Sequence, residues 1–178
     1  MKKLIQGIVR LDDWVLKATL ALCGALLAVM VAVAAAGVVC RFALHASLSW
    51  SEEFDAYLFV WLTCLGAAAG VKLRAHPQVR ALADRMPSFT QKAIADLTDA
   101  VVVALGVILV LYGGEMISMM GTETAASLPI SMTYPYLAIP VGGALLIFHS
   151  LVRILVAHAA PGATINAAPI VHGLPEHI

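Results

Sequence analysis

Four long apolar stretches constrain this 178-residue chain more than any other feature of its sequence. Each approaches the roughly 20 apolar residues that a helix needs to cross a bilayer. The chain is 61% hydrophobic and only 12% charged, whereas soluble domains are about 45–50% apolar and about 25% charged. A soluble fold of this length could not bury so much apolar surface. We therefore expect neither a soluble enzyme nor a nucleic-acid-binding protein, but an all-α membrane protein with four transmembrane helices, at about residues 18–40, 54–71, 98–120 and 134–157.

Residues 1–160 are predicted to form a single four-helix transmembrane domain, and residues 161–178 a disordered tail. Between the second and third spans, Pro77 and Pro87 bracket an amphipathic segment, which we predict to be a short helix lying in the membrane interface. The first apolar run begins well inside the chain and is longer than the roughly 7–15 residues of a signal-peptide core, which argues against a cleaved signal peptide. The three cysteines form no CxxC pair, so we expect buried apolar residues rather than a disulfide framework.

Basic residues are distributed unevenly over the segments that connect the spans. The N-terminal segment carries four Lys or Arg residues, and the segment between the second and third spans carries five. The loop after the first span has only Arg41, and the loop after the third span has none. Because lysine and arginine near the ends of spans favour the cytoplasmic side, this pattern predicts that both termini and the central polar segment lie in the cytoplasm.

Two capping boxes are predicted at the starts of helices. A capping box pairs a serine at the helix start with a Glu or Gln three residues later, and the chain offers Ser49 with Glu52 and Ser88 with Gln91. The second of these lies well before the third apolar stretch. We therefore expect the third helix to begin in the polar layer and to enter the membrane only some turns later.

The loop between the first two spans is expected to hold an ion pair. Arg41 ends the first span, while Glu52 and Glu53 begin the second, so all three should lie at the outer surface of the membrane. We expect Arg41 to pair with one of the two acids under the cover of Trp50. The alternative at this point is a solvated capping box without an ion pair.

Ionisable side chains deep in a bilayer are costly and mark functional sites, yet the predicted spans carry almost none at mid-depth. Lys17, Asp99 and Glu115 lie near the ends of spans, where they can reach the interface, and Lys17 could pair with Asp99. His149 is the only histidine well inside a span, and no facing span offers a second histidine that could hold haem with it. The sequence therefore predicts no catalytic residue, no substrate-binding or metal site and no cofactor.

Small and aromatic residues give the clearest packing signals. Gly66 and Gly70 form a GxxxG motif in the second span, and a ridge of small residues recurs every four positions along the first. Such ridges let helices approach closely in lipid, either within one chain or between subunits. The second span also carries an aromatic face on which Trp61 lies near mid-span, which suggests packing against protein. The ridge consists of Gly24, Ala28, Ala32 and Ala36, and the aromatic face of Trp50, Phe54, Tyr57 and Trp61.

An ordered series of motifs resembles one protein family, the small membrane subunit of TRAP transporters (tripartite ATP-independent periplasmic transporters). The series includes a Trp-Ser-Glu-Glu cluster followed by an aromatic run, and the resemblance extends over nearly the whole chain up to Arg153. The matching segments are Arg41-Phe42, Ser49–Glu53, Tyr57–Leu62, Gly66–Ala68, His76, Tyr136–Gly142 and His149.

The resemblance implies a scaffold rather than a transport site. The family's transporters import organic acids across the bacterial inner membrane with a sodium gradient, and a large membrane subunit carries the substrate and sodium sites. The implied partners are that large subunit, a transient periplasmic substrate-binding protein and membrane lipid, without nucleic acid. Two alternatives are the small subunit of a tripartite tricarboxylate transporter and a haem or anchor subunit of a membrane redox enzyme. Candidate subunit-contact or structural residues are Arg41, Trp50, Glu52, Glu53, Tyr57, Trp61, Gly66, Gly70 and His76.

Overall fold

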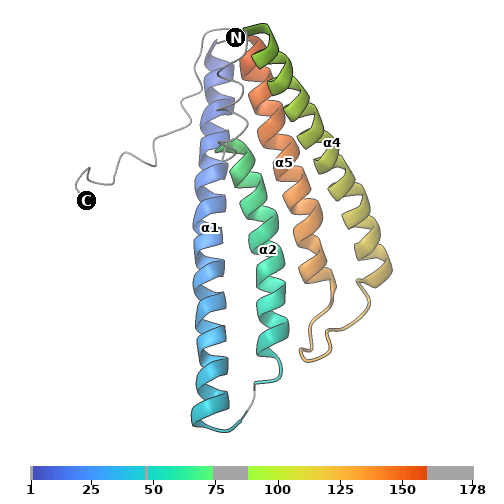
Figure 1. Cartoon of the computed structure of the whole chain (residues 1–178). Coiled ribbons are helices and arrows are strands. Elements are labelled where there is room, and N and C mark those ends of the chain that lie inside the picture. The colour runs from blue at the N-terminus through green and yellow to red at the C-terminus, as the bar shows by residue number, and fades with distance from the viewer. Residues whose placement is uncertain (1, 47, 74–87, 160–178) are drawn as a thin grey trace, which may run out of the picture.

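Four helices make up almost all of the structure. The computed structural model (Figure 1) describes residues 2–46, 48–73 and 88–159, so the predicted interfacial helix and the predicted tail lie outside the described residues. Each helix is long and apolar enough to cross a membrane, which confirms the four predicted spans. The helices are α1 (Lys2–Ala43), α2 (Ser51–Lys72), α4 (Ser88–Met120) and α5 (Thr133–Ala159).

The helices stand side by side in a single row (Figure 1). The order across the row is α1, α2, α5, α4, because α5 packs against both α2 and α4, and α1 packs mainly against α2. Among the described residues, α4 contacts neither α1 nor α2. The row is therefore one helix thick and does not close into a bundle.

An open row leaves much apolar surface uncovered. In the most apolar 18-residue stretch of α5, 39% of the residues are buried, whereas the corresponding stretch of α1 has no buried residue. The helix at one edge of the row thus has no fully buried residue in its most apolar stretch. Because lipid solvates such side chains well, this exposure fits a membrane protein and would be untenable in water.

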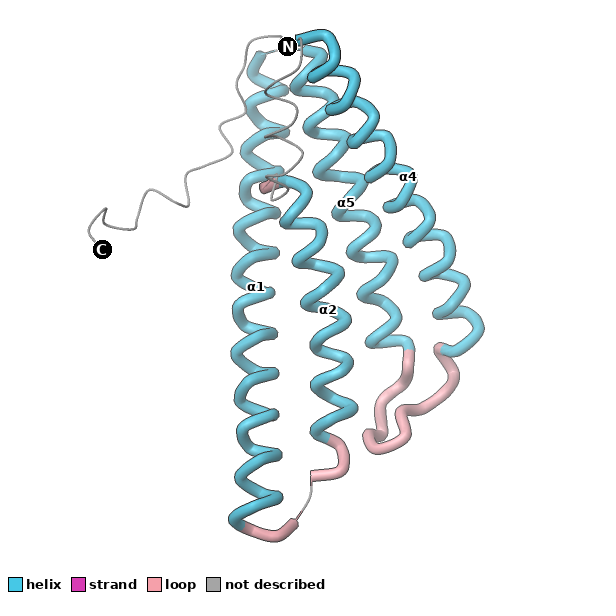
Figure 2. Tube along the Cα trace, in the orientation of Figure 1, coloured by secondary structure: helices cyan, strands magenta, loops and turns pink. Residues whose placement is uncertain are grey.

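The two ends of the row differ in what they contain. At one end, α1 and α4 begin while α2 and α5 finish; we call this the terminal end. The other end, which we call the loop end, holds the two short connections drawn as loops in Figure 2. There the segment 121–132 folds back on itself, with Ala125 N–H donating to Ile130 O at 2.9 Å and Met132 N–H donating to Glu123 O at 2.9 Å.

The first helix is much longer than predicted. It begins at Lys2 rather than near residue 18, and its 42 residues span about 63 Å, whereas the hydrocarbon core of a bilayer is about 30 Å thick. The polar residues before Lys17 are thus the first turns of the same helix. They stay helical because one face of these turns packs against the neighbouring helices, with Asp12 and Leu16 both buried.

Of the two predicted capping boxes, the structure contradicts the first, and the side chains of the second, Ser88 and Gln91, lie outside the described ones. The box of Ser49 and Glu52 is wrong, because α2 begins at Ser51 and its N-cap residue, Trp50, makes no side-chain capping bond. The hydroxyl of Ser51 instead donates to Leu48 O at 2.9 Å and ties the loop to the helix start. The third helix does begin at Ser88, as predicted.

Candidate functional site

A buried carboxylate joins three helices at the terminal end of the row. Asp12 of α1 is only 6% exposed. One of its oxygens accepts a hydrogen bond from His149 Nδ1 of α5 at 2.6 Å, and the other forms an ion pair with Lys72 of α2. Lys72 also contacts Asp13, whose side chain is more than half exposed, at 2.7 Å. We call Asp12, Asp13, Lys72 and His149 the Asp12 cluster.

A second ion pair continues this line of contacts to the far edge of the row. Asp99 of α4, only 5% exposed, pairs with Arg153 of α5. Arg153 follows His149 by one helical turn, so the two side chains lie on the same face of α5. The predicted partnership of Asp99 with Lys17 is wrong, because α4 and α1 stand at opposite edges of the row.

Together these contacts link all four helices, because Asp12 joins α1 to both α2 and α5, and Asp99 joins α4 to α5. Buried charges are tolerated when they are paired and hydrogen-bonded, and here each carboxylate meets a cation from the next helix. The sequence analysis missed the Asp12 cluster because it considered only the basic residues of the N-terminal segment. A signal was present, since Asp12, Leu16, Thr19 and Cys23 follow the spacing of one helix face.

At the loop end, the carboxylate of Glu53 organises the connection between α4 and α5. It accepts hydrogen bonds from the Tyr57 hydroxyl at 2.5 Å, from Ala126 N–H at 3.0 Å and from Ser127 N–H at 2.6 Å. The Tyr57 hydroxyl also lies 3.5 Å from Met132 Sδ. Glu53 therefore acts as an anchor for a loop more than 70 positions away in the chain.

The predicted ion pair of Arg41 with Glu52 or Glu53 is wrong. Arg41 is exposed and makes no ion pair with any described residue, and Glu52 is exposed as well. The carboxylate of Glu53 accepts hydrogen bonds from backbone amides of the loop, whereas the sequence analysis expected it to pair with the guanidinium of Arg41. Trp50 covers no ion pair, and its ring packs edge-on against Phe54 with centroids 6.1 Å apart.

Replacing Glu53 by glutamine is expected to release the loop. An amide can accept from the two N–H groups only with its single oxygen and without charge, so hydrogen exchange at Ala126 and Ser127 should speed up by roughly ten-fold. Exchange measured by mass spectrometry on peptides covering this loop tests the expectation. Glu52→Gln is the matched control and should leave the same peptides unchanged; equal effects of both substitutions would contradict the anchoring role.

Trp61 links α2 to the first turn of α5. Its indole N–H donates to Tyr134 O at 3.1 Å, so the ring contacts the protein itself at this depth. His76, the remaining candidate from the central segment, lies outside the described residues.

Glycines pack the row tightly, but they are not the glycines of the GxxxG motif. A Cβ added at Gly66 or Gly70 would meet no atom within 4 Å. Along the α4–α5 contact the situation is reversed, because a Cβ at Gly143 would lie 2.7 Å from Gly106 O. At Gly142 it would lie 2.8 Å from Cys64 Cβ, where α5 meets α2. The close approach of these helices thus depends on glycines that the motif search did not single out.

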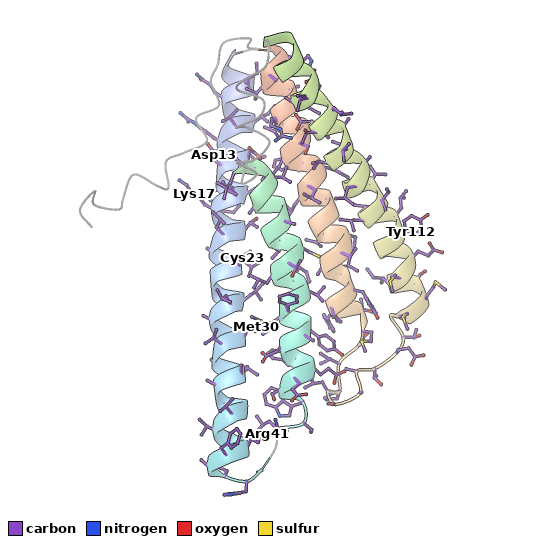
Figure 3. The ribbon with its side chains drawn as sticks, in the orientation of Figure 1. Asp13, Lys17, Cys23, Met30, Arg41 and Tyr112 are labelled. Carbon is purple, nitrogen blue, oxygen red and sulfur yellow. The ribbon has the colours of Figure 1, made fainter. Side chains whose placement is uncertain are left out.

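The small-residue ridge of α1 is also unoccupied within the chain. Gly24, Ala28, Ala32 and Ala36 are all exposed, whereas the packed face of α1 carries side chains such as Cys23 and Met30, which Figure 3 draws toward α2. The ridge of α1 therefore stays exposed in this chain, as does Gly66 of the GxxxG motif, whereas Gly70 is half-buried.

The described residues provide packing and ionic ties rather than a reactive centre. Within residues 2–46, 48–73 and 88–159, no group of three or more His, Cys, Asp or Glu side chains could hold a metal ion. The buried side chains of Asp12, Asp99 and His149 are used in contacts between helices, and the large remaining surface is apolar. Such an arrangement can hold four helices in a fixed row.

Comparison with known proteins gives consistent matches. A family model described as tripartite ATP-independent periplasmic transporters, DctQ component, matches residues 30–159. The sialic acid TRAP transporter small permease protein SiaQ of Vibrio cholerae is 28% identical over 130 residues, covering 72% of this chain and 75% of that protein. The C4-dicarboxylate TRAP transporter small permease protein DctQ of Rhodobacter capsulatus is 31% identical over 107 residues, covering 59% and 47%.

A third relative is much longer than this chain. The isethionate TRAP transporter permease protein DctMQ of Oleidesulfovibrio alaskensis is 28% identical over 131 residues, which are 72% of this chain but only 20% of that protein. The family model covers well over half of the chain and includes the last third of α1 and all of α2, α4 and α5. This match favours a transporter subunit over a haem or anchor subunit of a membrane redox enzyme. The chain belongs to the DctQ component family, the small permease subunits of TRAP transporters.

Proposed function

We propose that this chain is a non-substrate-binding membrane subunit that scaffolds the large subunit of a sodium-driven, binding-protein-dependent importer of organic acids. The observation that carries the proposal is the open row, in which the apolar stretch of α1 has no buried residues. Lipid solvates this surface, but the exposed ridge of small residues on α1 also lets a helix of another subunit approach closely. A large membrane subunit lying against the row would use that surface.

The relatives support both the partner and the class of substrate. Four fifths of the DctMQ permease lie outside its match to this chain, which is consistent with a small permease unit joined to a larger one in that protein. Sialic acid, C4-dicarboxylates and isethionate, the compounds in the relatives' names, are all organic acids. The transported acid of this system is expected to be an anion of the same broad class, recognised by partners rather than by this chain.

Reconstitution into liposomes tests the proposal. This chain alone should give no uptake under a sodium gradient, because its buried carboxylates, Asp12 and Asp99, are engaged in ion pairs between helices and offer no path for an ion. The large subunit with the periplasmic binding protein should give little uptake until this chain is added. Sodium-driven uptake by this chain without the large subunit would contradict the proposal, and so would full uptake by the large subunit without this chain.

The proposed topology puts the terminal end of the row in the cytoplasm of a bacterial inner membrane. A cysteine introduced at Thr124, in the loop between α4 and α5, should then react with a membrane-impermeant maleimide in intact cells. A cysteine at Gly7, where a side chain meets no atom within 4 Å, should react only after the membrane is opened. Labelling of the Gly7→Cys variant in intact cells would invert the topology.

The acidic character of the loop end suggests contact with the periplasmic binding protein. Glu52, Glu115 and Glu123 are all exposed, and none makes an ion pair with a described residue. The binding protein would approach this end of the row when it delivers substrate to the large subunit.

A further inference from the structure

We propose that one face of α1 near its start binds the headgroups of anionic phospholipids. The face consists of Arg10, Trp14 and Lys17, which we call the Arg10 face. The proposal concerns this chain in a bilayer by itself and does not depend on the proposed role in transport.

The three side chains share one side of the helix. At 3.6 residues per turn, positions 10, 14 and 17 fall within about 60° of one another, while position 12 points to the opposite side. Asp12 is buried against α2 and α5, so the Arg10 face points away from the row. Figure 3 shows Lys17 on the side of α1 that faces away from α2.

The charges on this face are uncompensated within the described chain. Arg10 and Lys17 are exposed, and neither makes an ion pair with a described residue. The two nearest acids, Asp12 and Asp13, both contact Lys72, and neither forms an ion pair with Arg10 or Lys17. Two free cations on a helix side are complementary to phosphate-bearing headgroups.

The depth of the face matches a headgroup layer. The apolar run from Ala18 to Cys40 spans about 34 Å at 1.5 Å per residue, close to the roughly 30 Å of a hydrocarbon core. Lys17 therefore stands at the edge of the core, and its side chain tilts toward the helix start and hence toward the headgroups. Trp14 is 68% exposed and lies one turn further out, where tryptophan rings favour the membrane interface.

Fluorescence quenching by brominated lipids tests the proposal. The full chain with Trp50→Phe and Trp61→Phe retains Trp14 as its only tryptophan, and its helix content is checked by circular dichroism. It is reconstituted into phosphatidylcholine bilayers with an equal minor fraction of brominated phosphatidylglycerol or brominated phosphatidylcholine. The brominated phosphatidylglycerol should quench Trp14 more strongly, with a relative association constant of about ten.

Charge-removing variants assign the preference to this face. Arg10→Gln with Lys17→Gln should bring the relative association constant to about one. Arg41→Gln is the matched control, because it removes an exposed and unpaired cation at the other end of the same helix, and it should leave the preference intact. Equal quenching of the parent by both lipids would overturn the proposal, as would a preference that survives the double substitution. If the double substitution reduces only co-purification with the large subunit while the parent shows no lipid preference, the face binds that subunit and the proposal is wrong.

Discussion

Replacing Asp12 by alanine is expected to lower the free energy of unfolding by about 3 kcal/mol. The substitution removes the one carboxylate that meets both α2 and α5, and it leaves the buried His149 Nδ1 without its acceptor. Lys72 keeps its contact with Asp13, which places the expected loss at the lower end of the range for breaking a buried ion pair. Titration with SDS in mixed micelles, followed by circular dichroism, measures the difference.

Asp13 provides the matched control for this experiment. It is the next residue along the helix and also contacts Lys72, but its side chain is more than half exposed, so Asp13→Ala should cost less than about 1 kcal/mol. A double-mutant cycle between Asp12→Ala and Lys72→Met should give a coupling energy of at least about 1 kcal/mol. Equal losses for the two aspartates, or no coupling to Lys72, would show that the buried cluster does not hold the helices together.

Replacing Gly143 by alanine is expected to cost about 1–3 kcal/mol, although alanine is the better helix former. The added methyl carbon would lie 2.7 Å from Gly106 O and 2.9 Å from Leu109 Cβ, so α4 and α5 would have to move apart. The nearest atom is a backbone oxygen, which cannot rotate away as a side chain could. Because α4 packs only against α5 among the described helices, its attachment to the row depends on this contact.

Alanine substitutions at Gly114 and Gly66 serve as controls that separate the effect of packing on stability from the effect of helix propensity. A Cβ at either position meets no atom within 4 Å, so Gly114→Ala and Gly66→Ala should be neutral or slightly stabilising in detergent. The same SDS titration serves for all three variants. If Gly66→Ala is as harmful as Gly143→Ala, the GxxxG motif rather than the α4–α5 contact limits stability within the chain.

The spans could be predicted from the sequence because length and hydropathy alone determine whether a helix crosses a bilayer. The starts of α2 and α5 fall within three residues of the predicted spans. The start of α1 was missed because its first turns are polar, and hydropathy does not reveal that Asp12 is neutralised by residues 60 and 137 positions away.

The candidate site was predicted only in part, because contacts between segments far apart in the chain depend on the fold. The sequence analysis singled out Glu53, Tyr57 and Trp61, which do make contacts at the loop end. It gave Glu53 the wrong partner, because charge complementarity pointed to Arg41 while the amides that bind it lie in a loop brought close only by the fold. The glycines were misjudged because a small residue indicates where a close approach is possible, whereas the facing helix decides where it occurs.

The spatial order of the helices has a consequence for how the chain is made. Synthesis delivers α1, α2 and α4 before α5, yet in the finished row α5 stands between α2 and α4, which do not contact each other. The row can therefore be completed only after α5 has been made. Until then, α4 has no neighbour among the described helices, and a ribosome that stops after residue 120 leaves an α1–α2 hairpin and a separate helix rather than three quarters of a row.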